Sequence, residues 1–276
     1  MIENQEFKKL LTIATHAALE AGKEINAVYQ EKDFEVESKA DESPLTLADR
    51  KAHETIMSHL KQTDYPVLSE EGKDISYEER SKWDYFWLVD PLDGTKEFIK
   101  KNGEFTVNIA LIRQGEPILG VVFAPYVNEL YFGTETFGAY KVIGNQGEPM
   151  EFEDIDELMK QGQILPLSYK RDKLVVVASR SHLNEETQAY VDKLKKKHGD
   201  AEFVSKGSSL KICMVAEGKA DVYPRFAPTM EWDTAAGHAV ALAAGYPVTR
   251  KDGKTPLLYN KKELKNPYFI VKSKKL

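Results

Sequence analysis

An apolar run that ends abruptly in two acids, a proline and a glycine constrains this chain more than any other stretch. The run Tyr85 to Val89 is predicted to be a buried strand, and Asp90-Pro91-Leu92-Asp93-Gly94-Thr95 follows it directly as a turn. Pro91 fixes its own φ and has no N–H, so it holds the backbone between the acids and lets the Leu92 carbonyl point outward beside them. Two carboxylates in one tight turn repel each other unless a cation lies between them. A solvated turn after a strand is the ordinary alternative, and other parts of the sequence argue against it.

The composition limits the class of protein. At 276 residues the chain can form one large domain or two small ones, and its net charge of -6 argues against nucleic-acid binding through a basic face. Its single cysteine, Cys213, has no partner within the chain, so we expect a reducing compartment and an inert buried thiol. The first residues are charged, and no apolar stretch is long enough to cross a bilayer. The sequence therefore predicts a soluble, cytoplasmic protein.

The first half of the chain is predicted to combine two helices with an antiparallel sheet. Apolar residues at steps of three and four predict a helix from Glu3 to about Gln30 and a second helix whose apolar stripe starts at Leu45, which puts Thr46 and Asp49 at its beginning. The predicted strands, the second of which runs into a polar turn, are 34–38, 65–72, 85–89, 105–112, 118–123, 129–132 and 138–142. Loop residues fill 39–44. Because short turns join the later strands, we expect a meander.

The second half alternates strands with helices, which is the α/β pattern. Residues 144–173 are predicted to cross between the halves around a short helix. The predicted strands that follow are 174–178, 201–204, 220–223, 246–249 and 268–271, and the predicted helices are 183–194, 208–217 and 232–244. We therefore expect one folded unit, 1–276, with a metal-binding α+β half in about 1–143 and an α/β half in about 174–276 that completes the substrate site.

Five acids stand where strands or loops meet helix starts, and they are Asp49, Glu70, Asp90, Asp93 and Asp233. Five carboxylates can converge only if cations neutralise them. Oxygen ligands of this kind, with a backbone carbonyl and without a cluster of His or Cys, favour Mg²⁺ or Mn²⁺ over zinc. Acids at strand ends are common on the surface of any α/β protein, so spacing alone leaves their convergence open.

Four segments occur in the order and approximate spacing of the inositol monophosphatase superfamily, the lithium-sensitive magnesium phosphatases. They are Thr46-Leu47-Ala48-Asp49, Ser69-Glu70-Glu71, Asp90-Pro91-Leu92-Asp93-Gly94-Thr95 and Trp232-Asp233-Thr234-Ala235-Ala236-Gly237. The chain resembles this family over residues 46–237. The resemblance implies a five-layered α-β-α-β-α sandwich, with an antiparallel sheet in the first half and a mixed sheet in the second.

Within the superfamily the chain is similar to the CysQ-type 3'(2'),5'-bisphosphate nucleotidases. The segments that carry this similarity are Ser38-Lys39-Ala40-Asp41 with Ser43-Pro44, residues 94–99, residues 102–110, Gly207-Ser208-Ser209-Leu210-Lys211, Tyr223-Pro224-Arg225-Phe226 and Glu231-Trp232-Asp233. The similarity implies a Mg²⁺-dependent phosphomonoesterase of sulfur metabolism. Such an enzyme removes the 3'-phosphate of 3'-phosphoadenosine 5'-phosphate to give AMP, and the corresponding 5'-phosphosulfate is a related substrate.

The resemblance also implies two or three Mg²⁺ ions, with Mn²⁺ as an alternative and Li⁺ as an inhibitor. The implied ligands are Glu70, Asp90 and the Leu92 carbonyl for one ion and Asp90, Asp93 and Asp233 for another. One ion would lower the pKa of a water and the other would neutralise the leaving oxygen. Thr95 and Asp49 would orient and deprotonate that water. Because phosphoryl transfer depends mainly on positioning and charge, no nucleophilic side chain is needed.

A second phosphate needs a basic pocket of its own in an acidic protein. By resemblance, the residues near the 5'-phosphate are His182, Ser208, Lys211 and Arg225, with charge from Lys and Arg and a short donor from Ser. The rest of the implied substrate site is Glu70, Leu92, Asp93, Gly94, Thr95 and Asp233, where backbone amides and a helix N-terminus can bind phosphate. Each of the basic-pocket residues has an ordinary alternative: Ser208 as a helix cap, His182 in a turn, and Arg225 paired with a surface acid.

Other functions stay open on the sequence. An inositol monophosphatase or related sugar phosphatase would share the metal ligands without a second-phosphate pocket. A haloacid-dehalogenase-type phosphatase would use Asp90 as a nucleophile, but the spacing of its second acid is wrong by one residue. A divalent-cation-binding interaction module would use the acids structurally, yet an EF-hand loop starting at Asp90 needs an acid where the chain has Lys101.

The expected partner is a small nucleotide bisphosphate and not a nucleic acid. The resemblance is compatible with a monomer or a homodimer. It is also compatible with peripheral association with the inner face of the cell membrane, without a transmembrane segment.

Overall fold

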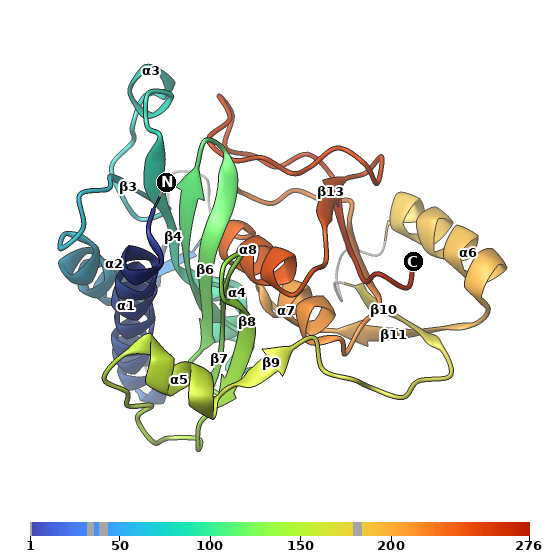
Figure 1. The fold of residues 1–276 in the computed structure, drawn as a ribbon, viewed down its shortest axis with the longest axis horizontal. Coiled ribbons are helices and arrows are strands. Elements are labelled where there is room, and N and C mark those ends of the chain that lie inside the picture. The colour runs from blue at the N-terminus through green and yellow to red at the C-terminus, as the bar shows by residue number, and fades with distance from the viewer. Residues whose placement is uncertain (1, 32–35, 39–43, 179–183) are drawn as a thin grey trace.

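Two β-sheets alternate with three layers of helices in the order α-β-α-β-α (Figure 1). The computed structural model describes residues 2–31, 36–38, 44–178 and 184–276. The outer layers are α1 (Asn4–Gln30) with α2 (Leu47–Leu60) on one side and α6 (Glu185–His198) on the other, and α7 (Leu210–Glu217) and α8 (Ala235–Ala243) lie between the sheets. The predicted five-layered sandwich is therefore confirmed.

The larger sheet has the strand order β3-β4-β5-β6-β7-β8-β9. In that order the strands are Val67–Ser69, Tyr85–Asp93, Thr106–Arg113, Glu116–Ala124, Glu129–Thr134, Gly138–Ile143 and Gln163–Leu165. The predicted antiparallel meander runs from β4 to β8, and β9 extends it. Two features were not predicted. The edge strand β3 pairs with β4 in parallel, and β9 comes from the segment expected to be only a crossover, whose short helix is α5 (Ile155–Gln161).

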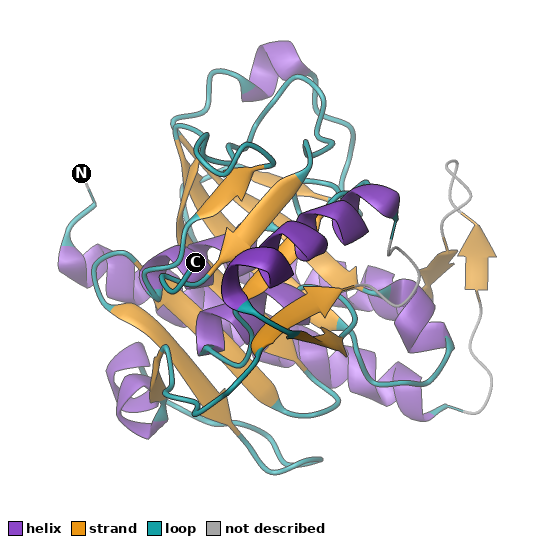
Figure 2. Ribbon diagram, turned by 90° about the vertical axis from the view of Figure 1, so that its right-hand side faces the viewer, coloured by secondary structure: helices purple, strands orange, loops and turns teal. Residues whose placement is uncertain are grey.

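The smaller sheet has the order β11-β10-β12-β14-β13. Its strands are β10 (Leu174–Ala178), β11 (Ala201–Ser205), β12 (Val222–Arg225), β13 (Val248–Arg250) and β14 (Phe269–Lys272). β10 is parallel to β11 and β12, whereas β14 is antiparallel to β12 and β13, so the sheet is mixed as predicted. In Figure 2, which is viewed from the side of this sheet, α6 crosses in front of its strands.

Short elements account for most of the remaining differences. The strands β1 (Val36–Ser38) and β2 (Pro44–Thr46) form a separate antiparallel pair, and β2 lies beside α4 (Thr95–Ile99). Pro44 was predicted in a loop but begins a strand, a position where its missing N–H is tolerated; residues 39–43 of that loop lie outside the described residues. The helix α3 (Tyr77–Arg80) and α4 were not predicted, because about one turn leaves no periodic pattern in the sequence.

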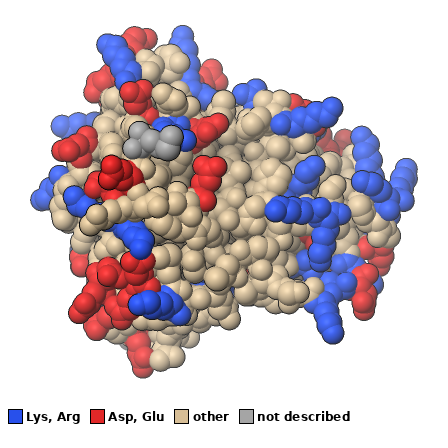
Figure 3. Space-filling view, in the orientation of Figure 1, with Lys and Arg blue, Asp and Glu red and all other residues tan. Residues whose placement is uncertain are grey.

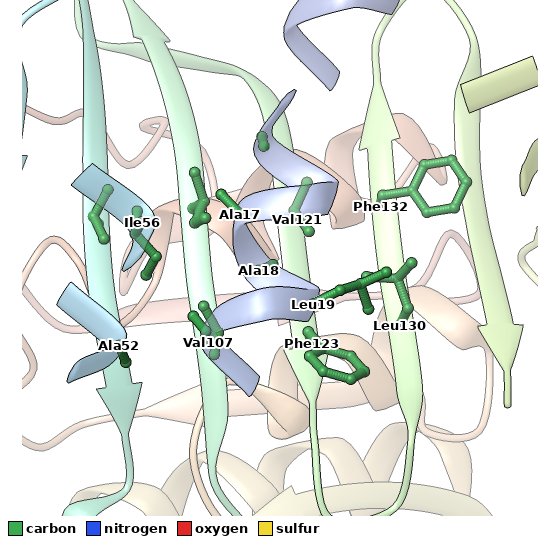
Figure 4. Close-up of a cluster of buried hydrophobic side chains, with 14 of the residues drawn as sticks. Ala17, Ala18, Leu19, Ala52, Ile56, Val107, Val121, Phe123, Leu130 and Phe132 are labelled. Carbon is green, nitrogen blue, oxygen red and sulfur yellow. The ribbon is translucent and has the colours of Figure 1, made fainter. Parts of the chain in front are cut away.

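Two helices cover the outer face of the larger sheet and form its first core (Figure 4). Ala17 and Ala18 of α1 and Ile56 of α2 belong to one cluster with Val121 and Leu130 of the sheet. The alanines let the α1 backbone lie close to the strands, and larger side chains fill the space around them. Burial of one Val, Leu, Ile or Phe side chain contributes roughly 1.5–3 kcal/mol, so this face holds β4 firmly in place.

The start of α2 is fixed by a capping box. Asp49 Oδ2 accepts hydrogen bonds from Thr46 N at 2.8 Å and Thr46 Oγ1 at 2.6 Å, and Thr46 Oγ1 accepts one from Ala48 N at 3.2 Å. Such a box satisfies N–H groups of the first helical turn that have no partner within the helix. The prediction that Thr46 and Asp49 begin this helix is confirmed, and Asp49 is buried there.

The inner helix α8 lies very close to the larger sheet because a glycine faces it. A Cβ atom on Gly120 of β6 would lie 2.3 Å from the Ala236 carbonyl oxygen and 2.7 Å from the Ala239 Cβ. No larger residue fits at this crossing. Since Asp233 lies two residues before the first residue of α8, the same contact brings that acid to the sheet.

The layer of α7 and α8 joins the two sheets into one core. Buried residues of this core come from the larger sheet (Leu88), from α7 and α8 (Val215 and Val240) and from the smaller sheet (Val271). Cys213 is buried in it, as predicted. Among the residues that the structure describes, no helix combines the length and the apolar character needed to cross a bilayer.

One buried histidine should make the fold sensitive to acid. Burial lowers the pKa of His238 in α8 from 6.5 to about 3. The unfolded chain takes up a proton at this residue below about pH 6.5, whereas the folded chain does not. The stability present above pH 6.5 is therefore lost as the pH falls toward 3, by at most about 1.4 kcal/mol per pH unit. We expect His238→Gln to reduce the loss of unfolding free energy between about pH 7 and pH 4, measured by urea denaturation.

The matched control for this measurement is His198→Gln, which changes an exposed histidine at the end of α6. It should leave the pH dependence of the unfolding free energy unchanged. The same acid slope in wild type and His238→Gln would contradict the assignment of the acid sensitivity to this side chain.

Candidate functional site

A β-bulge in β4 turns two acids to the same face of the larger sheet. Asp90 pairs with Asn108 of β5 and Asp93 pairs with Thr106, so β4 has one extra residue between the two pairs. Side chains alternate along a strand, and acids three positions apart would otherwise point to opposite faces. The bulge also accommodates Pro91, which has no N–H for the ladder. Both carboxylates therefore point toward the layer of α7 and α8, and the strand runs to Asp93 rather than ending at residue 89.

Two further acids reach this place from other elements. Glu70 follows β3, and its N–H donates to the Val89 carbonyl at 3.1 Å, which sets it beside Asp90. Asp233 precedes α8, and its Oδ2 accepts a hydrogen bond from Met230 N at 2.9 Å. Carboxylate oxygens of Glu70, Asp90 and Asp233 all lie within 4.8 Å of one another. Three segments far apart in the sequence thus converge on one point.

These acids repel each other because little water screens them. Burial raises the pKa of Asp90 well above its ordinary value, and the carboxylates of Glu70, Asp93 and Asp233 raise it further. Burial also raises the pKa of Asp233, with Asp93 as its main charged neighbour, and that of Asp93 itself. Buried like charges are tolerated only when protons or cations neutralise them.

The set of donor atoms fits a hard divalent cation. Within the described residues, the cluster of Glu70, Asp90 and Asp233 contains carboxylates and neither His nor Cys. On the same face, Asn108 Oδ1 and Thr106 Oγ1 are buried and have no hydrogen-bond partner in the described part of the chain. Oxygen-only surroundings match Mg²⁺ or Mn²⁺ better than zinc. The structure therefore contains a candidate metal site.

Thr95, one of the two predicted catalytic residues, links the other one, Asp49, to the turn at residues 90–95. Thr95 Oγ1 lies 3.3 Å from Asp49 Oδ1 and 3.3 Å from the Leu92 carbonyl oxygen, so its single proton serves one of these acceptors at a time. The Leu92 side chain is buried in the core, and its N–H donates to Asp90 Oδ1 at 3.0 Å. Gly94 has a φ of 95°, a left-handed conformation that favours glycine. The turn thus places Thr95 beside the acidic cluster, where its hydroxyl lies next to Asp49 of α2.

A cavity of about 490 Å³ lies beside the acids, between α4, α7 and β12. Its charged lining residues include Asp93, Asp233, Lys96, Lys100, Lys211 and Arg225, and Gly94 and Ser208 also line it. Acids and cations therefore share one cavity. Such a cavity suits a ligand with several anionic groups if cations cover the acids.

Two of the basic residues predicted to bind the second phosphate, Lys211 and Arg225, line this cavity. Burial lowers the pKa of Lys211, and the nearby Asp93 opposes that shift. Arg225 Nη2 donates to the Pro228 carbonyl at 2.9 Å, and its Nε is buried without a partner among the described residues. In the described part of the chain Arg225 forms no ion pair, so the alternative of a surface ion pair finds no support there.

Ser208, which was expected to donate a hydrogen bond to the second phosphate, donates to a backbone carbonyl instead. The helix α7 begins at Leu210 with Ser209 as N-cap, so Ser208 does not cap it. Ser208 has a φ of 42° and donates its hydroxyl to the Glu104 carbonyl at 2.6 Å. In this arrangement Ser208 offers the cavity an acceptor rather than the expected donor. His182 lies outside the described residues.

Sequence reasoning did not single out four residues that lie at the site. Ser209 Oγ is 3.1 Å from Asp93 Oδ2, and Asn108 Nδ2 is 3.4 Å from the same oxygen. Lys96 and Lys100 line the cavity. Three of them had a signal in the sequence: Asn108 is an amide within the apolar strand β5, and Lys96 in α4 lies four positions before Lys100, which follows that helix. Ser209 left no such signal.

Charge is distributed unequally over the molecule. Acids outnumber bases in residues 1–169, and bases outnumber acids in residues 170–276. On the face shown in Figure 3, Lys and Arg gather over the smaller sheet and α6, and acids cluster over α5. Such a field attracts anions toward the basic half, which contributes Lys211 and Arg225 to the cavity.

Curated relatives match nearly the whole chain. The chain matches the model of the Inositol monophosphatase family over residues 6–275. It is 49% identical over 258 residues to the 3'(2'),5'-bisphosphate nucleotidase CysQ of Escherichia coli (strain K12), which covers 92% of this chain and 96% of the relative. It is 35% identical over 258 residues to the Haemophilus influenzae protein of the same name, with 92% of this chain and 89% of the relative covered.

A solved structure agrees with these matches. The fold is similar to the crystal structure of CysQ from Bacteroides thetaiotaomicron, described as a bacterial member of the inositol monophosphatase family. The TM-score is 0.89 at 54% sequence identity, and the match covers 98% of this chain and 99% of that chain. The fold, the order of the acidic segments and the matches lead to one conclusion: the chain belongs to the inositol monophosphatase family.

Proposed function

We propose that this chain is a Mg²⁺-dependent phosphomonoesterase that removes the 3'-phosphate of 3'-phosphoadenosine 5'-phosphate and yields AMP and phosphate. The observation that carries the proposal is the adjacency of a buried acidic cluster and a cavity lined by cations. The relatives named above are 3'(2'),5'-bisphosphate nucleotidases, and that name specifies a substrate with two phosphates. The proposal includes a role in sulfur metabolism and activity on the corresponding 5'-phosphosulfate.

The acidic cluster is inferred to hold the metal of this metal-dependent family. The proposed ligands are Glu70, Asp90 and the Leu92 carbonyl for one ion and Asp90, Asp93 and Asp233 for another. Bound Mg²⁺ or Mn²⁺ would supply Lewis-acid chemistry, that is, an activated water and a neutralised phosphate. The proposal includes two or three ions and inhibition by Li⁺. Its support is the oxygen-only donor set and the mutual repulsion of the acids.

Asp49 and Thr95 are inferred to prepare the attacking water. Asp49 Oδ2 is held by Thr46, which keeps Oδ1 directed at the Thr95 hydroxyl. When Thr95 donates to Asp49, its oxygen lone pairs can accept a proton from a water. Asp49 then serves as the general base through the threonine. The remaining work is positioning, which the rigid turn at residues 90–95 performs.

The cations of the cavity are inferred to bind the 5'-phosphate. The unpartnered Nε of Arg225 can donate together with an Nη atom in the paired geometry that suits phosphate oxygens. Lys211 adds a charge beside it, and the exposed Lys96 and Lys100 add two more. Ser208 can donate to a phosphate only if its hydroxyl leaves the Glu104 carbonyl. His182 remains part of the proposed pocket.

An inositol monophosphatase is the second candidate, and the family match favours it. An inositol monophosphatase needs the acids to bind metal, but its substrate has no second phosphate and requires no second basic pocket. The four cations that line the cavity are the feature that favours the nucleotidase over it.

A panel of phosphoesters should separate these candidates. We expect Mg²⁺-dependent phosphate release from 3'-phosphoadenosine 5'-phosphate with a higher kcat/KM than from its 5'-phosphosulfate, 3'-AMP or inositol 1-phosphate. EDTA should abolish the activity and Li⁺ should reduce it. A higher kcat/KM for inositol 1-phosphate would favour the second candidate, and full activity in EDTA would exclude the proposed metal chemistry.

The stability of the metal-free protein should reveal the repulsion directly. Burial raises the pKa of the Asp90 carboxyl group in the folded protein, which means that its charged form destabilises the fold. Because Asp90→Asn removes this charge, the metal-free variant should have a higher Tm than metal-free wild type at neutral pH. The gain should be about 2–4 °C in Tm for each kcal/mol of repulsion removed. Mg²⁺ should raise the Tm of wild type more than that of the variant. The exposed Asp64→Asn is the control, and a lower Tm for metal-free Asp90→Asn would contradict the model.

The second-phosphate pocket predicts a substrate-specific effect. Arg225→Ala should raise the KM for 3'-phosphoadenosine 5'-phosphate about 10- to 100-fold, the range expected for lost charge-assisted hydrogen bonds. The KM for 3'-AMP, which has no 5'-phosphate, should change little. The exposed Arg250→Ala serves as a matched control in steady-state assays. Equal effects of Arg225→Ala on both substrates would argue against this pocket.

A further inference from the structure

Two polar side chains interrupt the inner face of β5, the face that packs against α7 and α8. Ala110 and Ile112 on this face belong to the core around those helices. Thr106 and Asn108 point to the same side, because alternate residues of a strand share a face, and they are 0% and 1% exposed. A buried hydroxyl and a buried amide carry a free-energy cost unless they form hydrogen bonds. We call Thr106 and Asn108 the polar pair of β5.

The ladder between β4 and β5 places this polar pair opposite two acids of the candidate metal site. Asn108 pairs with Asp90, and Thr106 pairs with Asp93. Side chains that stand opposite each other in an antiparallel ladder point to the same side of the sheet and are direct neighbours. The polar interruption of β5 therefore coincides with the acids of β4.

The Asn108 amide already has one partner among the acids. Its Nδ2 lies 3.4 Å from Asp93 Oδ2, which also accepts a hydrogen bond from Ser209 Oγ at 3.1 Å. When a cation is bound, the Asp93 carboxylate is ionised and can only accept. The nitrogen of the Asn108 amide therefore faces Asp93, and Oδ1 points away from it.

The oxygen atoms of the polar pair lack a partner. Asn108 Oδ1 and Thr106 Oγ1 are buried and form no hydrogen bond within the described part of the chain. An ionised carboxylate cannot donate to Asn108 Oδ1, so the neighbouring acids do not satisfy it. Water that hydrates a bound cation can supply the donor that this oxygen needs.

Such an arrangement distinguishes Mg²⁺ from Ca²⁺. Mg²⁺ gives up its waters reluctantly and keeps several of them when it binds to a protein, whereas Ca²⁺ accepts more protein oxygens, Asn carbonyls included. Groups that hydrogen-bond to metal ligands orient these ligands and tune the affinity for the metal. An amide that holds both a ligand and a hydrating water thus favours the ion that stays hydrated.

We propose that Asn108 is a positioning residue that makes the acidic cluster selective for Mg²⁺ over Ca²⁺. Its N–H orients the Asp93 carboxylate, and its Oδ1 accepts a hydrogen bond from a water that hydrates the ion. Thr106 Oγ1 provides a second contact for the same hydration shell. The inference rests on the proposed function, because it requires that the acidic cluster binds Mg²⁺.

Metal binding by Asn108→Leu tests the proposal without substrate. The Kd of the full-length, metal-free protein for Mn²⁺ is obtained from the electron paramagnetic resonance signal of the free ion, and the Kd values for Mg²⁺ and Ca²⁺ from competition with Mn²⁺. Leu has a similar size but neither an N–H nor a carbonyl. We expect Mg²⁺ binding to weaken about 10- to 100-fold, the range for lost partners of metal ligands. Ca²⁺ binding should weaken less, so the preference for Mg²⁺ falls.

Further variants keep the test decisive if Asn108→Leu fails to fold. Asn108→Ala, which adds no bulk, should lower the preference for Mg²⁺ in the same way, and Thr106→Val should lower it by a smaller factor. The matched control is Thr249→Val, which removes a buried, unpartnered hydroxyl from β13 of the smaller sheet and should leave the preference unaltered.

The outcomes separate this inference from the proposed function. Direct ligation by Asn108 would make the loss for Ca²⁺ at least as large as that for Mg²⁺, and a merely structural amide would lower the metal-free Tm without changing the ratio of the two Kd values. Either result would overturn the proposal while the metal site of wild type stands. Wild type that binds neither Mg²⁺ nor Mn²⁺ would overturn the metal site and this inference together.

Discussion

Repulsion among buried carboxylates is the constraint on which this structure depends. Glu70, Asp90 and Asp233 approach within 4.8 Å, and burial increases the penalty for the charges of Asp90 and Asp233. Nothing local favours such an approach, so it must be imposed by packing. The core under α1 and α2 holds β4 from one side, and the core around α7 and α8 holds Asp233 from the other. The apolar layers thus offset the cost of a site that is prepared for cations.

The inner helical layer is positioned at both of its faces. Gly120 lets α8 touch the larger sheet, which places the turn that carries Asp233. The end of α7 is held by Glu217, which is buried and pairs with Lys141 of β8 at 3.2 Å and accepts hydrogen bonds from Tyr131 at 3.0 Å and Tyr169 at 2.7 Å. A buried ion pair adds little net stability, yet breaking it on one side is costly. We infer that this pair fixes the position of α7, and with it the start of that helix at the cavity.

Much of the fold could be predicted because the decisive patterns are local. The period of α1, the apolar runs and short turns of β5 to β8 and the order of strands and helices after residue 174 can each be recognised locally. The parallel pairing of β3 and the addition of β9 could not, because each depends on an edge that only the assembled sheet provides. The strand at Pro44 was missed because its residues are typical of a loop, and only its pairing with Ser38 makes it a strand. The helices α3 and α4 were missed because four or five residues, little more than one turn, are too few for a repeating pattern.

For the site, the sequence alone determined which residue types are available: acids at strand ends, a rigid Asp-Pro-Leu-Asp-Gly-Thr turn, and a few cations in an acidic chain. Only the tertiary structure decided how they meet. Alternation along a strand predicts opposite directions for Asp90 and Asp93, and the bulge opposite Thr106 and Asn108 reverses this. The direction of the Ser208 hydroxyl also depends on a partner far away in the chain, the Glu104 carbonyl. The physical reason is that side-chain identity is local, whereas register, burial and hydrogen-bond direction are properties of the packed whole.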